Sequence, residues 1–406
     1  MPDRPPLNLW RVVLALALLP VVLGLDRWAY WLSRSVLWLH LRDIGLPIST
    51  TGSLMTTQAT LNAFLVVAGG LVALGTGPVI PLVVGLVLSA LGYLVIAGGQ
   101  SPGAVWLGIG VLAMGQGLAK PACFAIAAAE LGHPREQLRA LAFVLLYAVL
   151  NASALSSGST AGLLATTFGA RAGFASAAGA TGLGALFAIA LGVAWLLTRR
   201  SEPAPPEPLR TGRVLLGAAG LVALGAPYSA LLTVVSSTSF SATGSTSMAW
   251  VTVVNPGMVI ATSLLVIPIL TLLHLRGVAL PALLVVAVGL CLAALAAVPL
   301  MLARSSVAAA AISEGALGVA EVLVGPFAMA RVVGDVPRRF QTLVMSGWFV
   351  VSGAVPIATS FVTRSFPKAE LIVLALVALG VFVAGAVLLF TAKPLSRWLY
   401  APAAAD

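Results

Sequence analysis

A cluster of ionisable side chains interrupts the first long apolar stretch of this sequence. Asp26, Tyr30 and Arg34 recur at intervals of four residues, and Arg27 precedes Tyr30 by three. On a helix this spacing places an acid, a phenol and two guanidiniums on one face. A guanidinium binds a carboxylate or phosphate through two parallel hydrogen bonds. The cluster therefore favours binding of an anionic group; the alternative is a structural ion pair that contacts no substrate.

Three more charged residues lie in apolar stretches further along the chain. Lys120 directly precedes Pro121, which kinks a helix, and we expect its ammonium group to pair with Asp26. Glu314 and Glu321 stand seven residues apart, which puts them on one helix face about 10 Å apart along the axis. A carboxyl in apolar surroundings can carry a proton or hold a substrate cation. Static pairing is the alternative for all three, and solvation is another for Glu314, which we place nearer the outer surface.

Uncharged polar and aromatic side chains occur at the same depth in other apolar stretches. Tyr147 and Asn151 are one helical turn apart, Asn255 is followed by a proline, and Trp348 lies in a later stretch. We expect these side chains to line the same cavity as the charged residues. Packing and hydrogen bonding between helices are the alternative roles for Asn and Trp in a membrane.

The elements that must position these side chains follow from the composition. The chain of 406 residues is 60% hydrophobic and 8% charged, whereas a soluble domain is about 25% charged. A spanning helix needs roughly 20 apolar residues, and a segment in lipid must satisfy its own backbone hydrogen bonds. The sequence therefore predicts an all-α polytopic membrane protein and not an enzyme. We expect about twelve spanning helices, near 11–40, 51–75, 78–98, 103–129, 138–167, 172–198, 214–240, 248–273, 278–302, 306–330, 340–363 and 370–392.

A charged, Pro-rich segment divides the predicted helices into two sets. Residues 199–213 read RRSEPAPPEPLRTGR, which is typical of a flexible linker. It separates an N-terminal six-helix half, 1–198, from a C-terminal six-helix half, 214–406. Two such halves are the architecture of major facilitator transporters, which rock around a site at the membrane midplane.

The net charge of +10 has a topological explanation. Most of the basic loop and tail residues fall on one side of the predicted topology, which places both termini in the cytoplasm. We therefore expect a lipid bilayer around the chain and no nucleic acid partner. The two cysteines lie in separate helical runs and the three histidines at helix ends or loops. This distribution favours no metal centre and no cofactor.

Several of these residues stand at spacings that occur together in one transporter family. The sequence resembles the proton-coupled oligopeptide transporters (POT, also called PTR), a branch of the major facilitator superfamily. The resemblance implies that family's fold and a monomer that encloses its own pathway. The matching positions are Asp26-Arg27, Tyr30-Trp31, Arg34, Gly115, Gly117, Lys120-Pro121, Tyr147, Asn151, Gly173-Phe174, Asn255-Pro256, Glu321, Pro326, Met345 and Trp348-Phe349.

The resemblance also implies roles for individual side chains. In the family, the second arginine of helix 1 binds the peptide carboxylate and the helix 10 glutamate binds the amino terminus. Arg34 and Glu321 would then hold the two ends of a di- or tripeptide-like zwitterion. The remaining substrate-binding residues would be Tyr30, Lys120, Tyr147, Asn151, Asn255 and Trp348. The family's helix 4 lysine and helix 1 acids form a salt-bridge network linked to the proton. We expect proton coupling and gating to involve Asp26, Arg27, Lys120, Glu314 and Glu321.

The sequence departs from the family pattern at identifiable positions. The first acid of the helix 1 motif is Leu23, and the second is shortened to Asp26. The helix 7 acid is missing, with Thr233 near its place, and that helix is instead rich in Ser and Thr. These departures bear on proton coupling, because they remove two titratable groups from the network.

Together these features predict a secondary active transporter that takes up small peptides or related zwitterions by alternating access, driven by protons. The excess of Arg over Lys suggests a bacterial source, so we expect the cytoplasmic (inner) membrane. One alternative is an exporter of drugs or metabolites, which the reduced charge network would suit. Another is a membrane sensor or partner subunit that keeps the fold without transporting.

Overall fold

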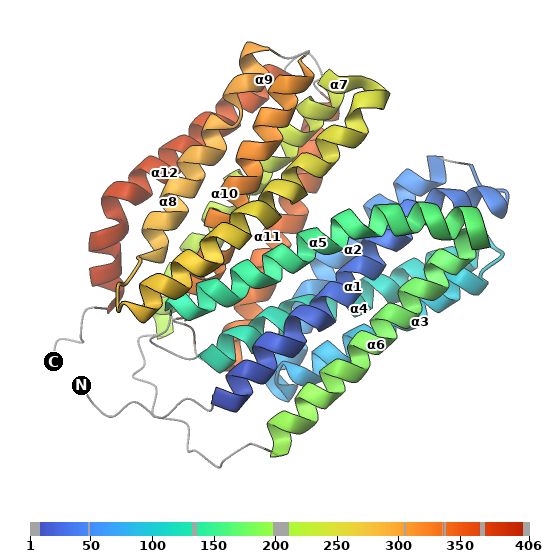
Figure 1. Ribbon diagram of the computed structural model, residues 1–406, viewed down its shortest axis with the longest axis horizontal. Coiled ribbons are helices and arrows are strands. Elements are labelled where there is room, and N and C mark those ends of the chain that lie inside the picture. The colour runs from blue at the N-terminus through green and yellow to red at the C-terminus, as the bar shows by residue number, and fades with distance from the viewer. Residues whose placement is uncertain are drawn as a thin grey trace. The chain divides into compact units, whose positions relative to one another are not determined.

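The computed structural model describes residues 9–47, 49–131, 136–197, 211–303, 306–334, 336, 338–365 and 370–400. Within these ranges all the regular elements are α-helices, as the composition predicts (Figure 1). The helices are α1 (Leu9–Asp43), α2 (Ser49–Thr76), α3 (Val79–Gly98), α4 (Pro102–Leu131), α5 (Glu136–Phe168), α6 (Ala170–Leu197), α7 (Thr211–Leu275), α8 (Ala282–Leu295), α9 (Val298–Leu302), α10 (Val307–Gly334), α11 (Arg338–Ser365) and α12 (Glu370–Tyr400).

Twelve segments of the described residues are long and apolar enough to span a membrane, which confirms the predicted number. They coincide with the predicted runs, but they do not map one to one onto helices. The ninth span, Ala282–Leu302, is divided between α8 and α9. Pro299 near the start of α9 has no backbone N–H to continue the α8 ladder.

Helix α7 contains two spans, Gly217–Ser239 and Val253–Leu275. Its 65 residues would extend roughly 98 Å if straight, about three times the hydrocarbon thickness of a bilayer. Figure 1 shows instead that α7 doubles back between the two spans. The helix therefore serves as two membrane elements.

The chain forms two compact units that do not follow chain order strictly. Unit 1 contains residues 1–135, 156–208 and 337–346, and unit 2 contains 136–155, 209–336 and 347–406. Helices α5 and α11 each contribute to both units. The predicted halves, 1–198 and 214–406, stay a prediction. Of the predicted linker, residues 199–210 lie outside the described part of the chain.

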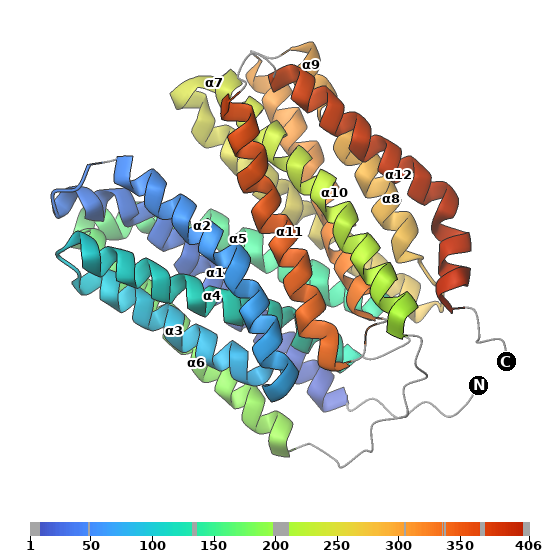
Figure 2. The same ribbon diagram turned by 180° about the vertical axis from the view of Figure 1, so that it is seen from behind.

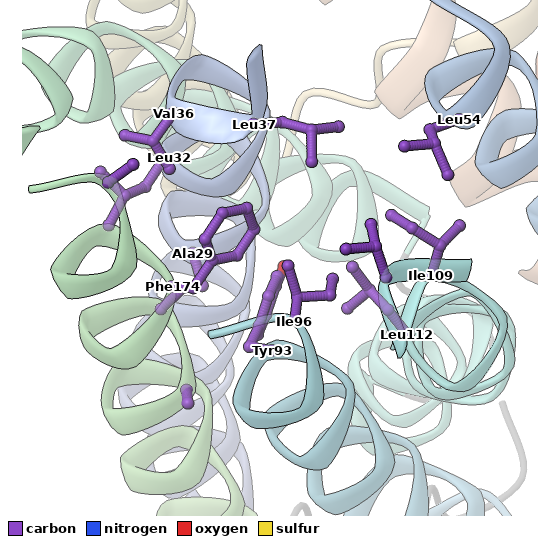
Figure 3. Packing of buried hydrophobic residues seen from close by; sticks show 14 of the residues in the cluster. Ala29, Leu32, Val36, Leu37, Leu54, Tyr93, Ile96, Ile109, Leu112 and Phe174 are labelled. Atoms are coloured by element: carbon purple, nitrogen blue, oxygen red, sulfur yellow. The ribbon is translucent and has the colours of Figure 1, made fainter. Parts of the chain in front are cut away.

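The core of unit 1 lies where α1, α3, α4 and α6 meet. Tyr93 and Ile96 of α3 pack between Ala29 of α1 and Leu112 of α4 (Figure 3). Phe174 of α6 is buried in the same cluster. Gly173 lets α6 approach α1 closely enough to bury Phe174, because a Cβ on Gly173 would lie 2.9 Å from the Val36 side chain of α1. The matched Gly173-Phe174 pair therefore has a packing role.

Helix α4 lies against α2 and α3 (Figure 2), and the matched glycines lie at these two contacts. A Cβ on Gly115 would lie 2.5 Å from the carbonyl oxygen of Gly85 on α3. A Cβ on Gly117 would lie 2.8 Å from the backbone of Leu65 on α2. Small residues at such crossings let membrane helices approach backbone to backbone. The two glycines thus fix α4 between its neighbours.

We expect Gly115→Ala to destabilise the protein by about 1–3 kcal/mol, because the added methyl group overlaps a backbone atom that no rotamer change can move. Gly110→Ala is the matched control on α4, since nothing lies within 4 Å of its built Cβ. That substitution should be neutral or stabilise by up to about 1 kcal/mol through helix propensity. Thermal unfolding of the purified protein in detergent measures both; equal effects would show that the crossing is not tightly packed.

Two turns depend on glycine. Helix α2 ends at Gly77, which has φ +76° and donates its N–H to the Ala73 carbonyl at 2.9 Å. Gly169 alone separates α5 from α6, with φ +82°. Other residues rarely adopt this left-handed conformation, so glycine permits both helix reversals.

Candidate functional site

The predicted cluster on α1 forms in unit 1. Asp26 and Arg27 are 2% and 7% exposed and form an ion pair, in which the Nε of Arg27 donates to Oδ2 of Asp26 at 2.8 Å. The Arg27 guanidinium also lies 5.0 Å from the ring centroid of Tyr30. Arg34 flanks the same ring at 5.3 Å and donates to its hydroxyl at 3.0 Å. The helical spacing thus places acid, phenol and both guanidiniums together as predicted.

Arg34 differs from Arg27 in its partners. Among the described residues, the interactions of Arg34 are with Tyr30, and no carboxylate pairs with it. Its side chain is half-buried, whereas Arg27 is buried against its own acid. A partly desolvated guanidinium held by a neutral phenol retains donors for an anionic ligand. Arg34 is therefore the α1 cation best suited to binding a carboxylate.

A network of uncharged polar side chains, absent from the predicted site, adjoins this cluster. The Gln116 amide oxygen accepts a hydrogen bond from Asn62 at 2.7 Å and one from Gln58 at 3.4 Å. The Gln116 amide nitrogen donates to the Tyr93 hydroxyl at 3.4 Å. Tyr93, fully buried on α3, interacts electrostatically with Asp26 and Arg27. The network links α2, α3 and α4 to the ion pair on α1.

Lys120 lies half-buried on α4, one turn beyond Gln116. Cys123 of the same helix interacts electrostatically with Asp26 and Arg27, so this part of α4 lies near the α1 ion pair. Oδ2 of Asp26 is engaged by Arg27, and Oδ1 accepts no hydrogen bond from the described residues. The pairing of Lys120 with Asp26 stays a prediction.

In unit 2, Glu321 of α10 lies among phenols. Both Tyr147 of α5 and Tyr228 of α7 interact electrostatically with its carboxyl, and Tyr228 also with Tyr147. Tyr147 reaches α10 because Gly325 is one turn beyond Glu321; a Cβ there would lie 2.7 Å from the Tyr147 hydroxyl. Tyr228, which the sequence reasoning missed, is 6% exposed. Its position after Pro227 in an apolar run was the available signal.

The remaining predicted substrate residues of unit 2 have local partners. Trp348 of α11 is 5% exposed, and its ring lies 3.3 Å from a Cβ built on Gly225 of α7. Asn151 donates to the backbone carbonyl of Tyr147, one turn earlier on α5, at 3.0 Å. Asn255 donates to the backbone carbonyl of Glu314 at 3.5 Å. Each side chain lies within a candidate membrane span, while direct substrate contact stays a prediction.

Glu314 occupies a different setting from Glu321. It is 5% exposed and lies about 10 Å along the axis from the first residue of α10. The hydroxyls of Ser236 and Ser239 on α7 interact with its carboxyl. Its Oε1 atom accepts no hydrogen bond from the described residues that meets normal geometry. Among the described residues, the side chains that interact with this carboxyl are therefore the two serines, and none of them is basic.

The start of α5 is bound to the end of α10 within unit 2. Glu136 and Arg331 form an ion pair at 3.4 Å, and Arg331 is 5% exposed. Arg139, 3% exposed, donates to the Ala330 carbonyl at 3.3 Å. Gln137 donates to the carbonyl of Val278, just before α8, at 2.9 Å. These contacts explain why residues 136–155 belong to unit 2.

We expect Glu136 and Arg331 to be energetically coupled by about 1–3 kcal/mol, because loss of Glu136 leaves a buried guanidinium without its acid. A double-mutant cycle of Glu136→Gln and Arg331→Gln in thermal unfolding measures the coupling. The exposed Arg42–Asp43 pair, 3.9 Å apart, is the control, and its coupling should stay below about 0.5 kcal/mol. Similar coupling energies for both pairs would show that the ion pair between α5 and α10 contributes little to stability.

We find no candidate metal-binding site in the part of the chain that the structure describes. No group of three or more His, Cys, Asp or Glu side chains there is arranged to hold a metal ion. The buried charged side chains among the described residues lie on four helices and are Asp26, Arg27, Arg139, Glu314, Arg331 and Glu370.

Comparison with known proteins addresses the fold. Neither a family model nor a curated protein matches the sequence. Solved structures do match. A POT peptide transporter in complex with sulfate has a TM-score of 0.67 at 18% identity, with 94% of this chain and 95% of that chain covered. A POT family transporter in complex with 5-aminolevulinic acid has a TM-score of 0.65 at 17% identity, covering 94% and 96%.

A third structure, of an auto-inhibited POT family peptide transporter, has a TM-score of 0.58 at 14% identity, covering 97% of this chain and 98% of that one. Near-complete coverage in both directions shows a common fold over almost the whole chain. The predicted major facilitator fold is therefore confirmed. Identities this low establish the architecture, and the function must be argued from the side chains.

Proposed function

We propose that this chain, an integral membrane protein with the fold of the POT transporters, is a divergent member of that family. It takes up small peptides or related zwitterions by alternating access, driven by protons. The solved structures of the same fold include peptide transporters and one bound to 5-aminolevulinic acid, which carries both an amino and a carboxyl group. The positive-inside bias supports cytoplasmic termini, and the excess of Arg over Lys supports a bacterial inner membrane.

The observation that carries this proposal is the state of Arg34. Its guanidinium is half-buried, is held by Tyr30 and has no acid partner among the described residues. A fixed cation in an apolar helix needs a compensating anion, and a substrate carboxylate supplies one. We propose that Arg34 binds the carboxylate of the substrate, with Tyr30 fixing the guanidinium plane.

For the amino group of the substrate we propose Glu321. Tyr147 and Tyr228 surround its carboxyl in unit 2 and can share hydrogen bonds with an ammonium group. We propose that Asn151, Asn255 and Trp348 contact the side chains and the peptide bond of the substrate. Lys120 completes the set, as the resemblance implies.

Proton coupling is proposed for the acids of the same network. Asp26 has one oxygen engaged by Arg27 and one without a hydrogen bond from the described residues. Protonation of Asp26 would release Arg27 and Lys120 to rearrange, and protonation of Glu321 would release the substrate amine. Glu314, nearer the outer end of α10, is proposed as a gating acid.

An exporter of drugs or metabolites is the second candidate. The observation that favours it is the absence of an acid from the first span of α7, where Thr233 donates to the Ser229 carbonyl at 2.8 Å. A network with fewer acids can select less strictly for zwitterions. Accumulation in inverted vesicles, with none in right-side-out vesicles, would favour export.

The proposal is tested by uptake of a labelled dialanine-type peptide into proteoliposomes under an inward proton gradient. We expect accumulation that collapses when an ionophore dissipates the gradient. If the peptide only equilibrates across the membrane, at a rate that does not depend on the proton gradient, then the protein transports peptides without proton coupling. No flux with correctly folded protein, combined with peptide binding, would support the sensor alternative.

A further inference from the structure

The network of uncharged polar side chains in unit 1 has an open end at Asn62 of α2. The Nδ2 group of Asn62 donates to Oε1 of Gln116 at 2.7 Å, and the Nε2 group of Gln116 donates to the Tyr93 hydroxyl at 3.4 Å. The Oδ1 atom of Asn62 is buried and accepts no hydrogen bond from the described residues. Each donor in this chain thus points away from Asn62, and a hydrogen-bond acceptor is left at its α2 end.

The orientation of the Asn62 amide follows from its partner. The Oε1 atom of Gln116 can only accept hydrogen bonds, and it also accepts one from Nε2 of Gln58 at 3.4 Å. If the Asn62 amide were turned over, two carbonyl oxygens would face each other across 2.7 Å, which is repulsive. Gln58 and Gln116 are each 2% exposed, so bulk water cannot replace these hydrogen bonds. The Oδ1 atom of Asn62 therefore points away from Gln116.

The network reaches the part of α1 that holds Arg34. Tyr93 packs against Ala29 of α1 (Figure 3). The next residue, Tyr30, accepts a hydrogen bond from Arg34 at 3.0 Å. Because Tyr93 connects α1 to Gln116 and Asn62, these side chains lie at the same depth in unit 1 as Tyr30. Asn62 is half-buried, so its acceptor oxygen lies near the surface of the unit.

The group that suits this acceptor is a neutral N–H. The side chains of the network carry no charge, so they do not balance an ammonium ion. The Arg34 guanidinium would also repel an ammonium ion placed in this part of unit 1. In a dipeptide the peptide nitrogen lies about 2.5 Å from the carboxyl carbon. A carboxylate bound to Arg34 therefore brings a peptide N–H into the same part of the unit.

We propose that Oδ1 of Asn62 accepts a hydrogen bond from the peptide N–H next to the carboxylate of the substrate. The inference rests on the proposed function and deepens it, because it makes the peptide bond itself part of what is recognised. A zwitterion without this N–H would leave the Asn62 oxygen unpaired, and a buried acceptor without a donor weakens binding. Arg34 and Asn62 together would then favour true peptides over other zwitterions.

The test is the affinity of the purified full chain for dialanine and for its ester-linked analogue, alanyl-lactate, measured by isothermal titration. The analogue has an ester oxygen in place of the peptide N–H and keeps both charged ends. We expect the wild type to bind dialanine about 3- to 10-fold more tightly than the analogue. Asn62→Leu and Asn62→Ala should lower this ratio to about 1, mainly by weakening the binding of dialanine.

The two variants differ in volume, so a packing defect would affect them unequally, whereas loss of the acceptor affects them alike. Thr60→Val is the matched control on α2, because the Thr60 hydroxyl donates to the Thr56 carbonyl of its own helix at 2.9 Å. It should keep the wild-type ratio. An unchanged ratio in both Asn62 variants, or equal wild-type affinities for the two ligands, overturns the inference and leaves the peptide proposal standing. If the wild type binds neither ligand, the peptide proposal fails, and this inference fails with it.

Discussion

Arg34→Ala should weaken binding of a dipeptide with a free carboxylate by about 2–3 kcal/mol, roughly 30- to 150-fold, while its C-terminal amide binds with unchanged affinity. The reason is that Arg34 has no acid partner among the described residues. Its guanidinium N–H groups are therefore available to donate hydrogen bonds to a ligand carboxylate. Arg34→Lys keeps the charge but loses the planar fork, and we expect an intermediate loss of about tenfold. Isothermal titration of both ligands to the purified protein measures the difference.

Arg42→Ala is the matched control for this experiment. Arg42 lies two turns beyond Arg34 on α1, is 62% exposed and stacks 5.6 Å from the Trp38 ring. Its removal should change neither affinity. If Arg34→Ala instead lowers the affinity for the acid and for the amide equally, Arg34 has a structural role in α1.

Glu321→Gln should reduce proton-driven uptake of a peptide with a free amino terminus by roughly 10- to 150-fold, the value of about 1.5–3 kcal/mol for a hydrogen bond to a charged group. The substitution preserves the shape of the side chain between Tyr147 and Tyr228 but removes its charge. Initial uptake rates in proteoliposomes, for the free peptide and for its N-acetyl derivative, measure the effect.

The N-acetyl derivative distinguishes substrate binding from coupling. If Glu321 binds the amino group, the derivative should be a poor substrate of the wild type and should lose little more in the variant. If Glu321 serves the proton alone, both substrates should lose uptake in equal proportion. Asp43→Asn, which neutralises a 52% exposed acid at the end of α1, should leave both rates unchanged.

The spans and the α1 cluster could be predicted because both depend on local properties of the sequence. A stretch of roughly 20 apolar residues must be a helix in lipid whatever its neighbours are. Likewise, helical periodicity alone brings Tyr30 beside Arg27 and Arg34, and the structure confirms that grouping.

The contacts between helices could not be derived in the same way. Gln58, Asn62, Tyr93 and Gln116 come from three helices, and nothing in their spacing indicates that they share hydrogen bonds. The same holds for Tyr228 beside Glu321, and for the α7 serines beside Glu314. Such networks depend on the rotation of each helix about its axis, which packing of the whole unit determines.

The assignment of residues 136–155 to unit 2 has the same origin. Chain order groups the start of α5 with the helices before the linker. Glu136, Gln137 and Arg139 instead bind α10 and the segment before α8. Their charge and length were visible in the sequence, but their partners lie more than a hundred residues away.

The glycine contacts of α4 have a mechanical consequence. A Cβ on Gly115 or Gly117 would lie within 2.8 Å of a backbone atom of the neighbouring helix, so few rotamer changes are available through which these helices could slide or tilt. Helices α2, α3 and α4 should then behave as one stiff plate. A pair of spin labels on α3 and α4 should therefore give a single narrow distance distribution throughout the working cycle. These helices would then serve as a fixed reference for measuring displacements elsewhere in the molecule.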